Sequence, residues 1–122
     1  MKGYVTNIEA DTLANRDYRR VLFTGPHTQL VLMTLQPGEE IGLEEHEGHD
    51  QFIRIESGTG VALLDGEQHV LTDGVALVIP SGAEHNVSNT SKSEPLRLYT
   101  LYSPPEHPDG TVHRTKADDS EH

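Results

Sequence analysis

The sequence predicts an all-β domain that forms a sandwich or a barrel. Short runs rich in Val, Ile, Leu and Thr are typical of strands, and here they recur roughly every eight to twelve residues. Turn-forming pairs such as Pro-Gly, Ser-Gly and Asp-Gly separate them. The expected strands are Gln29 to Leu35, Gln51 to Ile55, Gly60 to Leu64, His69 to Leu71, Val75 to Ile79 and Leu96 to Leu101.

Two local patterns refine this organisation. Asp65-Gly66 is expected to form a two-residue hairpin turn, because both central positions of a type I′ turn need a positive φ angle. Only Ile8 to Tyr18 has a helical pattern, with Asp11 or Thr12 as the candidate N-cap. We therefore divide the chain into an N-terminal segment, residues 1–18, that packs on the barrel, and the barrel itself, residues 19–103.

Residues 104–122 are expected to be an irregular C-terminal segment. Its first part contains three prolines, which remove backbone donors and fix φ. Ordering each further residue costs about 1–2 kcal/mol, and few apolar side chains follow Val112 to offset that cost. We expect disorder from about residue 115. Tyr102, His107 and His113 could bring this end of the chain across the barrel mouth, but a surface tail is the favoured interpretation.

Composition limits the function. A chain of 122 residues fits one domain, which can bury about two-thirds of its unfolded surface. It has no cysteine, so a metal site must use His, carboxylate or amide ligands. The formal net charge of −11 disfavours nucleic acids and membrane surfaces as partners. No apolar run reaches the roughly 20 residues that cross a bilayer, so we expect a soluble, cytoplasmic protein.

Four side chains of the ligand type are expected to converge. Alternation along a strand turns Glu44 and His46 to the same face. Gln51 begins the next strand, and His85 opens a later one after the turn at Pro80. If these strands are neighbours in a barrel, the four side chains meet at one point.

The same residues belong to two spaced patterns. They are Gly38, Glu44, His46, Gln51 and Gly58, and then Gly74, Pro80, Gly82, His85 and Asn89. Their spacing resembles the two motifs of the cupin superfamily, whose fold is a jelly-roll, double-stranded β-helix barrel. The resemblance spans about residues 29–102 and is to small single-domain cupins of the kind often labelled mannose-6-phosphate isomerase-like.

The resemblance implies a divalent metal, Fe, Mn, Zn or Ni, bound by Glu44, His46, Gln51 and His85. Glu44 stands where the family has its first histidine, and Gln51 stands where it has its glutamate. Two histidines and one carboxylate remain, which is the composition of the non-haem Fe(II) facial triad. Gln51 would add a weak amide ligand or hydrogen-bond a bound water or substrate. Glu44 and Gln51 are the candidate catalytic residues.

Simpler interpretations exist for each residue. A histidine at a strand start is usually a surface or hydrogen-bonded core residue, and Pro-x-Gly is usually only a turn. The acidic run around Glu44 would ordinarily be a solvated face. His49 and Asp50 could replace the predicted ligands if the corner is built differently. Burying part of this acidic run without a cation would be expensive, which favours a metal.

The expected function is a metal-dependent enzyme, of dioxygenase, isomerase or lyase type, acting on a small oxygenated organic substrate. The alternative is a non-catalytic cupin that binds a metal or small molecule, because Gln51 is not a carboxylate base. A phosphosugar substrate would need a cationic cradle, and alternation turns Arg54 away from the pocket. A neutral or weakly anionic substrate, such as a diketone, enediol or phenol, is expected. Covering an exposed edge strand would favour a homodimer.

Overall fold

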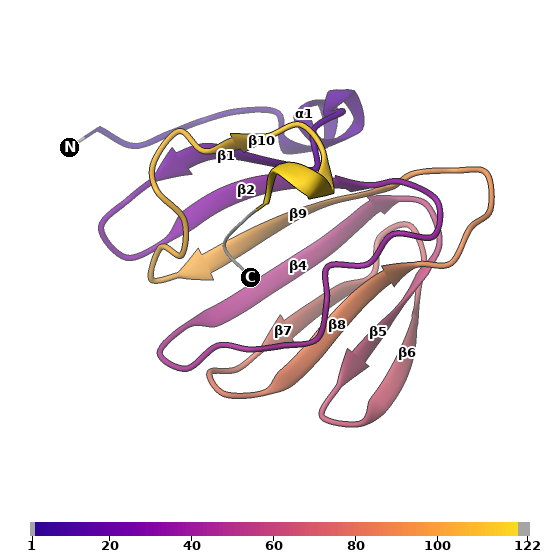
Figure 1. Cartoon of the computed structure of the whole chain (residues 1–122). Coiled ribbons are helices and arrows are strands. Elements are labelled where there is room, and N and C mark those ends of the chain that lie inside the picture. Colours follow the sequence, from indigo (N-terminus) through magenta and orange to yellow (C-terminus); the bar gives the residue numbers. More distant parts are fainter. Residues whose placement is uncertain (1, 120–122) are drawn as a thin grey trace.

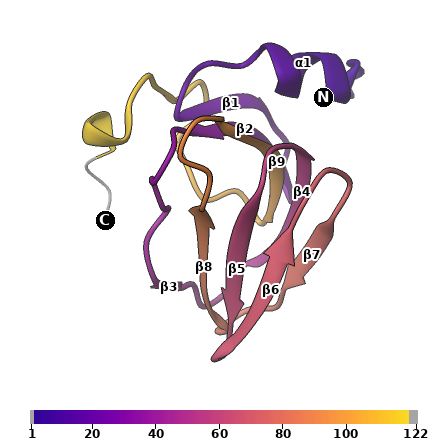
Figure 2. The same cartoon turned by 90° about the vertical axis from the view of Figure 1, so that its right-hand side faces the viewer.

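The fold consists of two antiparallel sheets that face each other (Figures 1 and 2), as seen in a computed structural model that describes residues 2–119. One sheet has six strands in the order β10-β1-β2-β9-β4-β7, and the other has four in the order β3-β8-β5-β6. The elements are α1 (Ile8–Ala14), β1 (Arg19–Thr24), β2 (Gln29–Leu35), β3 (Glu44–Glu45), β4 (Asp50–Ser57), β5 (Gly60–Leu64), β6 (Glu67–Leu71), β7 (Ala76–Ile79), β8 (Glu84–Asn89), β9 (Leu96–Ser103), β10 (Val112–His113) and the 3-10 helix η1 (Lys116–Asp118). The predicted all-β class is confirmed.

The expected strands are present with small changes of length. β2 and β5 have the predicted bounds, whereas β4, β6 and β9 are longer and β7 starts one residue later. Buried and less buried residues alternate along β4 and β9, so each strand turns one row of side chains into the space between the sheets. The hairpin turn is also as predicted, since Asp65 has φ 44° and Gly66 has φ 84°.

Strand register brings the two spaced patterns together. Glu44 on β3 lies directly opposite His85 on β8. On the other sheet, Tyr102 on β9 is paired with both Gln51 on β4 and Gln29 on β2. The side chains named by the sequence patterns therefore come from both sheets and face one interior.

The N-terminal segment packs on the outer side of the six-stranded sheet, where α1 contacts β9, β4 and β2 (Figure 2). The predicted N-cap, Asp11 or Thr12, is wrong. Asn7 caps the helix instead, because its side-chain oxygen accepts a hydrogen bond from the Ala10 amide at 3.0 Å. The helix ends at Ala14, where Asn15 turns its side chain to Thr34 of β2.

The structure differs from the expected disorder after about residue 115. β10 pairs with β1 at the edge of the six-stranded sheet, and η1 follows it. The Asp119 carboxylate then lies 2.7 Å from the Arg19 guanidinium, and both side chains are almost fully buried. Backbone pairing and this ion pair, rather than apolar side chains, offset the cost of ordering the segment. The predicted disorder is therefore wrong for residues 115–119. Residues 120–122 lie outside the described part of the chain.

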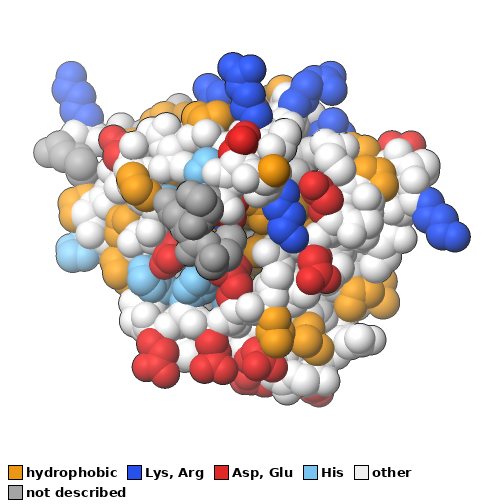
Figure 3. Space-filling model, viewed as in Figure 1, with side chains coloured by type: hydrophobic (Ala, Val, Ile, Leu, Met, Phe, Trp, Pro, Cys, Tyr) orange, Lys and Arg blue, Asp and Glu red, His pale blue; other side chains and the backbone are white. Residues whose placement is uncertain are grey.

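Charge is unevenly spread over the surface. Figure 3 shows Asp and Glu side chains along the lower edge of one face and Lys and Arg along its upper edge, with His side chains between them. No helix within residues 2–119 is both long enough and apolar enough to span a bilayer. The homodimer stays a prediction.

Candidate metal centre

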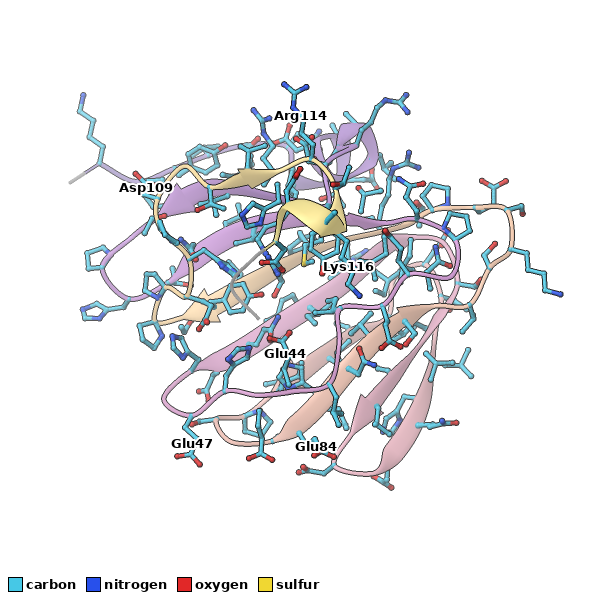
Figure 4. The ribbon with its side chains drawn as sticks, viewed as in Figure 1. Glu44, Glu47, Glu84, Asp109, Arg114 and Lys116 are labelled. Carbon is cyan, nitrogen blue, oxygen red and sulfur yellow. The ribbon has the colours of Figure 1, made fainter. Side chains whose placement is uncertain are left out.

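Three of the four predicted ligands come together. One potential ligand atom from each of Glu44, His46 and His85 lies within 4.8 Å of the others. Glu44 lies in the space between the two sheets, whereas Glu47 and Glu84 point away from it (Figure 4). Two imidazoles and one carboxylate form a donor set suited to a divalent first-row metal.

Local alternation selects one carboxylate from the acidic run. Glu44 and His46 are half-buried, whereas Glu45 and Glu47 between and beyond them are exposed. The solvated-face interpretation is therefore correct for Glu45 and Glu47 but not for Glu44. Strand-like alternation continues past the end of β3 and turns His46 inward.

His85 is oriented by the turn that precedes it. The Ala83 amide donates to the Pro80 carbonyl at 3.1 Å, which closes the turn. The Ala83 carbonyl then lies 2.9 Å from His85 Nδ1. A carbonyl oxygen only accepts hydrogen bonds, so Nδ1 carries the proton. The lone pair of Nε2 is then available to bind a metal ion. His85 is buried.

A residue of the second spaced pattern also makes a hydrogen bond to the segment that carries the first. The Gly82 amide donates to the His46 carbonyl at 2.9 Å, so the turn before β8 fixes the backbone of the segment after β3. His46 Nε2 lies 2.8 Å from Glu44 Oε2. A protonated Nε2 donates to this carboxylate, and a metal bound between the two groups would replace that proton.

Gln51 is buried on β4, and its Nε2 donates to Thr100 Oγ1 at 3.0 Å. Its role as a metal ligand stays a prediction. The two alternative ligands have other partners at the same corner. Asp50 Oδ1 accepts from the Ser81 amide at 3.0 Å, and His49 Nε2 lies 3.2 Å from Glu106 Oε2.

The C-terminal segment crosses the mouth of the barrel, so the favoured interpretation of a surface tail is wrong. Glu106 contacts His49 and also lies 3.8 Å from His46 Nδ1. Gln29 fastens the segment, because its Oε1 accepts from the Glu106 and His107 amides and its Nε2 donates to the His107 carbonyl at 2.7 Å. The signal for this contact was a buried glutamine as the first residue of a mostly apolar strand.

Two buried phenols, Tyr18 and Tyr102, interact electrostatically with Glu44. Burial raises the pKa of Tyr18 to about 12, and burial also raises the pKa of Tyr102. Arg19 lowers and Glu44 raises the pKa of both groups by their charges. Both hydroxyls therefore stay protonated at neutral pH and lie within electrostatic reach of Glu44 and Arg19.

Arg19 is a buried cation of the barrel that was not predicted from the sequence. It is buried at the start of β1, and its guanidinium carbon lies 5.3 Å from the centre of the Tyr18 ring. Burial alone would lower the pKa of Arg19, but its neighbours, among them the Asp119 carboxylate that it contacts, outweigh burial and raise it. The guanidinium is therefore charged. Alternation backwards from Val21 could have placed Arg19 on the inner face.

Comparisons with known proteins agree with this architecture. The Cupin domain family profile matches residues 31–102. The chain is 50% identical over 112 residues to protein L612 of Acanthamoeba polyphaga mimivirus, covering 89% of this chain and 70% of that protein. It is 47% identical over 123 residues to YrkC of Bacillus subtilis, covering 96% of this chain and 66% of YrkC.

A solved structure is similar over almost the whole chain. The crystal structure of a Bacillus halodurans protein has a TM-score of 0.93 and 47% identity, and the match covers 96% of this chain and 92% of that one. The chain spans about two thirds of the length of YrkC, so the activity of these relatives does not transfer directly. The fold, the family match and these relatives together show that the chain belongs to the cupin family.

Proposed function

We propose that the protein is a metal-dependent enzyme that acts on a small oxygenated organic substrate. The observation that carries this proposal is the convergence of Glu44, His46 and His85. These three residues would hold a divalent metal, which when bound polarises a carbonyl or enolate oxygen or binds O2. Three protein ligands leave coordination positions for a substrate.

The surrounding side chains support chemistry beyond metal storage. Glu106 is a carboxylate outside the three-residue set, and its position beside His46 suits it to accept a proton from a bound substrate. Tyr102 is buried nearby as a neutral phenol and can donate a hydrogen bond. Gln51, with its amide nitrogen held by Thr100, offers an amide oxygen to a water or hydroxyl group.

The proposed reaction classes are isomerase, lyase and dioxygenase. Proton transfer next to a polarised carbonyl, with Glu106 as the base, supports the first two. The second candidate function is a non-catalytic cupin that binds a metal or small molecule. It is favoured by Gln51, because an amide stands where a carboxylate base would otherwise be.

Metal content of the purified protein tests the site. After expression in metal-replete medium, we expect the wild type to carry Fe, Mn, Zn or Ni, measured by elemental mass spectrometry. Glu44→Ala and His85→Ala should lose most of it, because each removes one of three ligands. The matched controls are Glu45→Ala and His27→Ala, whose side chains are exposed and outside the site.

Equally low metal in the wild type and in all four variants would contradict the proposal. With metal present, O2 uptake and substrate loss are followed for a panel of diketones, catechols and 2-oxo acids. Turnover of any member supports the enzyme. Tight binding without turnover favours the binding protein.

A further inference from the structure

The segment between β9 and β10 is fixed to the barrel at both of its ends. Ser103, the last residue of β9, pairs with Asp50, and the Thr111 carbonyl accepts a hydrogen bond from the Val21 amide at 2.9 Å. We call the residues between these two ends, 104–110, the strap. Figure 1 shows the strap running from the end of β9 to β10. Its middle can therefore move as a loop whose ends stay in place.

Gln29 of β2 holds the middle of the strap. Its Oε1 accepts from the Glu106 and His107 amides at 3.2 and 3.0 Å, and its Nε2 donates to the His107 carbonyl at 2.7 Å. Gln29 is buried, and Nε2 also donates to Thr24 Oγ1 on β1. Three of the seven strap residues are prolines, which have no backbone N–H to donate to a sheet. A side chain of the barrel thus takes the place of strand pairing.

In this position the strap covers a predicted metal ligand. Glu106 Oε1 lies 3.8 Å from His46 Nδ1, and Glu106 Oε2 lies 3.2 Å from His49 Nε2. The Pro105 carbonyl oxygen is 3.3 Å from the same His49 nitrogen. The other edge of the His46 ring faces Glu44, 2.8 Å from Nε2, and the His46 side chain is only 28% exposed. Removing the strap would uncover the Nδ1 edge of His46.

The closed strap depends on few contacts. Among its residues, only His107 is buried, with its ring centre 5.1 Å from that of Tyr102, and Pro104, Pro108 and Asp109 are exposed. Water can replace the hydrogen bonds to Gln29, so each contributes only a small net free energy. Weakly packed segments of this kind open locally while the rest of the protein stays folded.

We propose that Gln29 holds the strap closed over the metal centre, and that breaking its hydrogen bonds opens the centre to metal and substrate. The inference rests on the proposed function for what lies beneath the strap, and it adds control of access to that function. Gln29 is in this view a positioning residue, because it acts on His46 through Glu106.

Amide hydrogen exchange of the full, metal-free chain tests the opening. Gln29→Met removes the amide group and keeps an unbranched side chain. Exchange of the Glu106 and His107 amides, followed by NMR, should become about tenfold faster, because three hydrogen bonds no longer favour the closed strap. The amides of Ile53 and Leu98, in the central strands β4 and β9, should exchange as in the wild type.

Two further glutamine variants sharpen this comparison. Gln29→Glu should exchange at rates between those of the wild type and Gln29→Met, because its carboxylate still accepts from both strap amides but has no donor for the His107 carbonyl. Gln36→Met, which alters an exposed glutamine just after β2, should behave as the wild type.

Access to the centre is measured separately. In the metal-free chain, diethyl pyrocarbonate should modify His46 about tenfold faster in Gln29→Met, whereas the exposed His27 should react equally in both proteins. With Zn²⁺ bound, Gln29→Met should release the metal to excess EDTA faster by a similar factor. Glu106→Ala should also speed release, and the double variant should release Zn²⁺ no faster than Gln29→Met, because both changes act through the strap.

Exchange that rises at Ile53 and Leu98 as much as in the strap would overturn the proposal, because Gln29 would then be only structural. Wild-type rates at Glu106, His107 and His46 in Gln29→Met would overturn it as well. If the wild type binds no metal but His46 becomes reactive in Gln29→Met, the strap stands and the metal function fails. If Zn²⁺ binds and leaves both proteins at one rate, the metal function stands and the strap does not control access.

Discussion

Burial of Tyr18 acts directly on the stability of the protein. Its side chain is 1% exposed, and its hydroxyl has no hydrogen-bond partner among residues 2–119. Desolvation raises the pKa of this phenol to about 12, against an ordinary value of about 10 in an unfolded chain. The folded state therefore holds a proton that the unfolded state releases earlier.

This difference predicts an alkaline loss of stability. Below pH 10 both states keep the proton, and the contribution of Tyr18 is fully present. Between pH 10 and 12 only the unfolded state releases it, so the free energy of unfolding falls by about 2–3 kcal/mol. Tyr18→Phe should lose this part of the decline and be no less stable at pH 8, because no hydrogen bond is removed. Urea unfolding at pH 8 and pH 11 measures both effects.

Tyr4→Phe is the control, because Tyr4 is exposed at 43% and stacks on Phe23 outside the barrel. Tyr102 should add an alkaline loss of its own, since burial raises its pKa as well. An alkaline decline in Tyr18→Phe as steep as in the wild type would assign the loss to other groups.

The sequence patterns and the structure bring the same three side chains together for a simple reason. Glu44, His46 and His85 follow from strand alternation and motif spacing, both of which are local. Alternation could have turned Arg19 inward, but its contact with Asp119 and the contact of Glu106 with His46 depend on the path of the C-terminal segment. That path is set by Gln29, a contact across 78 residues of sequence.

At the element scale, the turn between β4 and β5 packs closely against the start of β9 and makes a hydrogen bond to Asp73. Gly58 has φ 108°, and a Cβ atom there would lie 2.6 Å from the Pro95 carbonyl oxygen and 3.0 Å from Leu96 Cα. Its amide also donates to Asp73 Oδ1 at 3.0 Å. The last glycine of the first pattern therefore serves packing against the start of β9 and has no direct role at the metal centre.

Gly58→Ala should accordingly destabilise the protein more than Gly38→Ala. Both glycines have positive φ, and a side chain in that conformation costs about 1–2 kcal/mol. Gly38 has no atom within 4 Å of the added carbon, whereas Gly58 would also pay about 1–3 kcal/mol for the clash with backbone. Urea unfolding of the two variants gives the difference directly. An equal loss of unfolding free energy in both variants would mean that the loop before β9 moves to make room for the added Cβ at no cost.

Elements were predictable where they depend on their own residues. The long strands carry their alternation within themselves, and the Asp65-Gly66 turn carries its own φ preference. β10 is different, because two residues gain strand structure only by pairing with β1. Its order, and that of η1, comes from Arg19, which lies 100 positions before Asp119 by residue number (119 − 19 = 100). No local pattern reports such a contact.

For the molecule as a whole, the charge balance makes a bound cation a stabilising ligand. The net charge is −11, and the carboxylates of Glu44 and Glu106 are both held close to His46. Glu44, His46 and His85 come together only in the folded chain, because β3 and β8 must pair first. A metal that binds this set binds the native state and not the unfolded one, so binding and folding are linked.

Metal removal should therefore lower the melting temperature. At a free metal concentration 100 times the dissociation constant, the linkage gives about 2.7 kcal/mol of stabilisation. For a domain of this size that corresponds to a rise of about 10 °C in Tm. Scanning calorimetry of chelated protein with and without added Zn²⁺ or Mn²⁺ measures it. The shift should vanish in His85→Ala and persist in His27→Ala, whose side chain is exposed. A shift of equal size in His85→Ala would locate the stabilising cation on the acidic surface, since that variant lacks a ligand of the interior site.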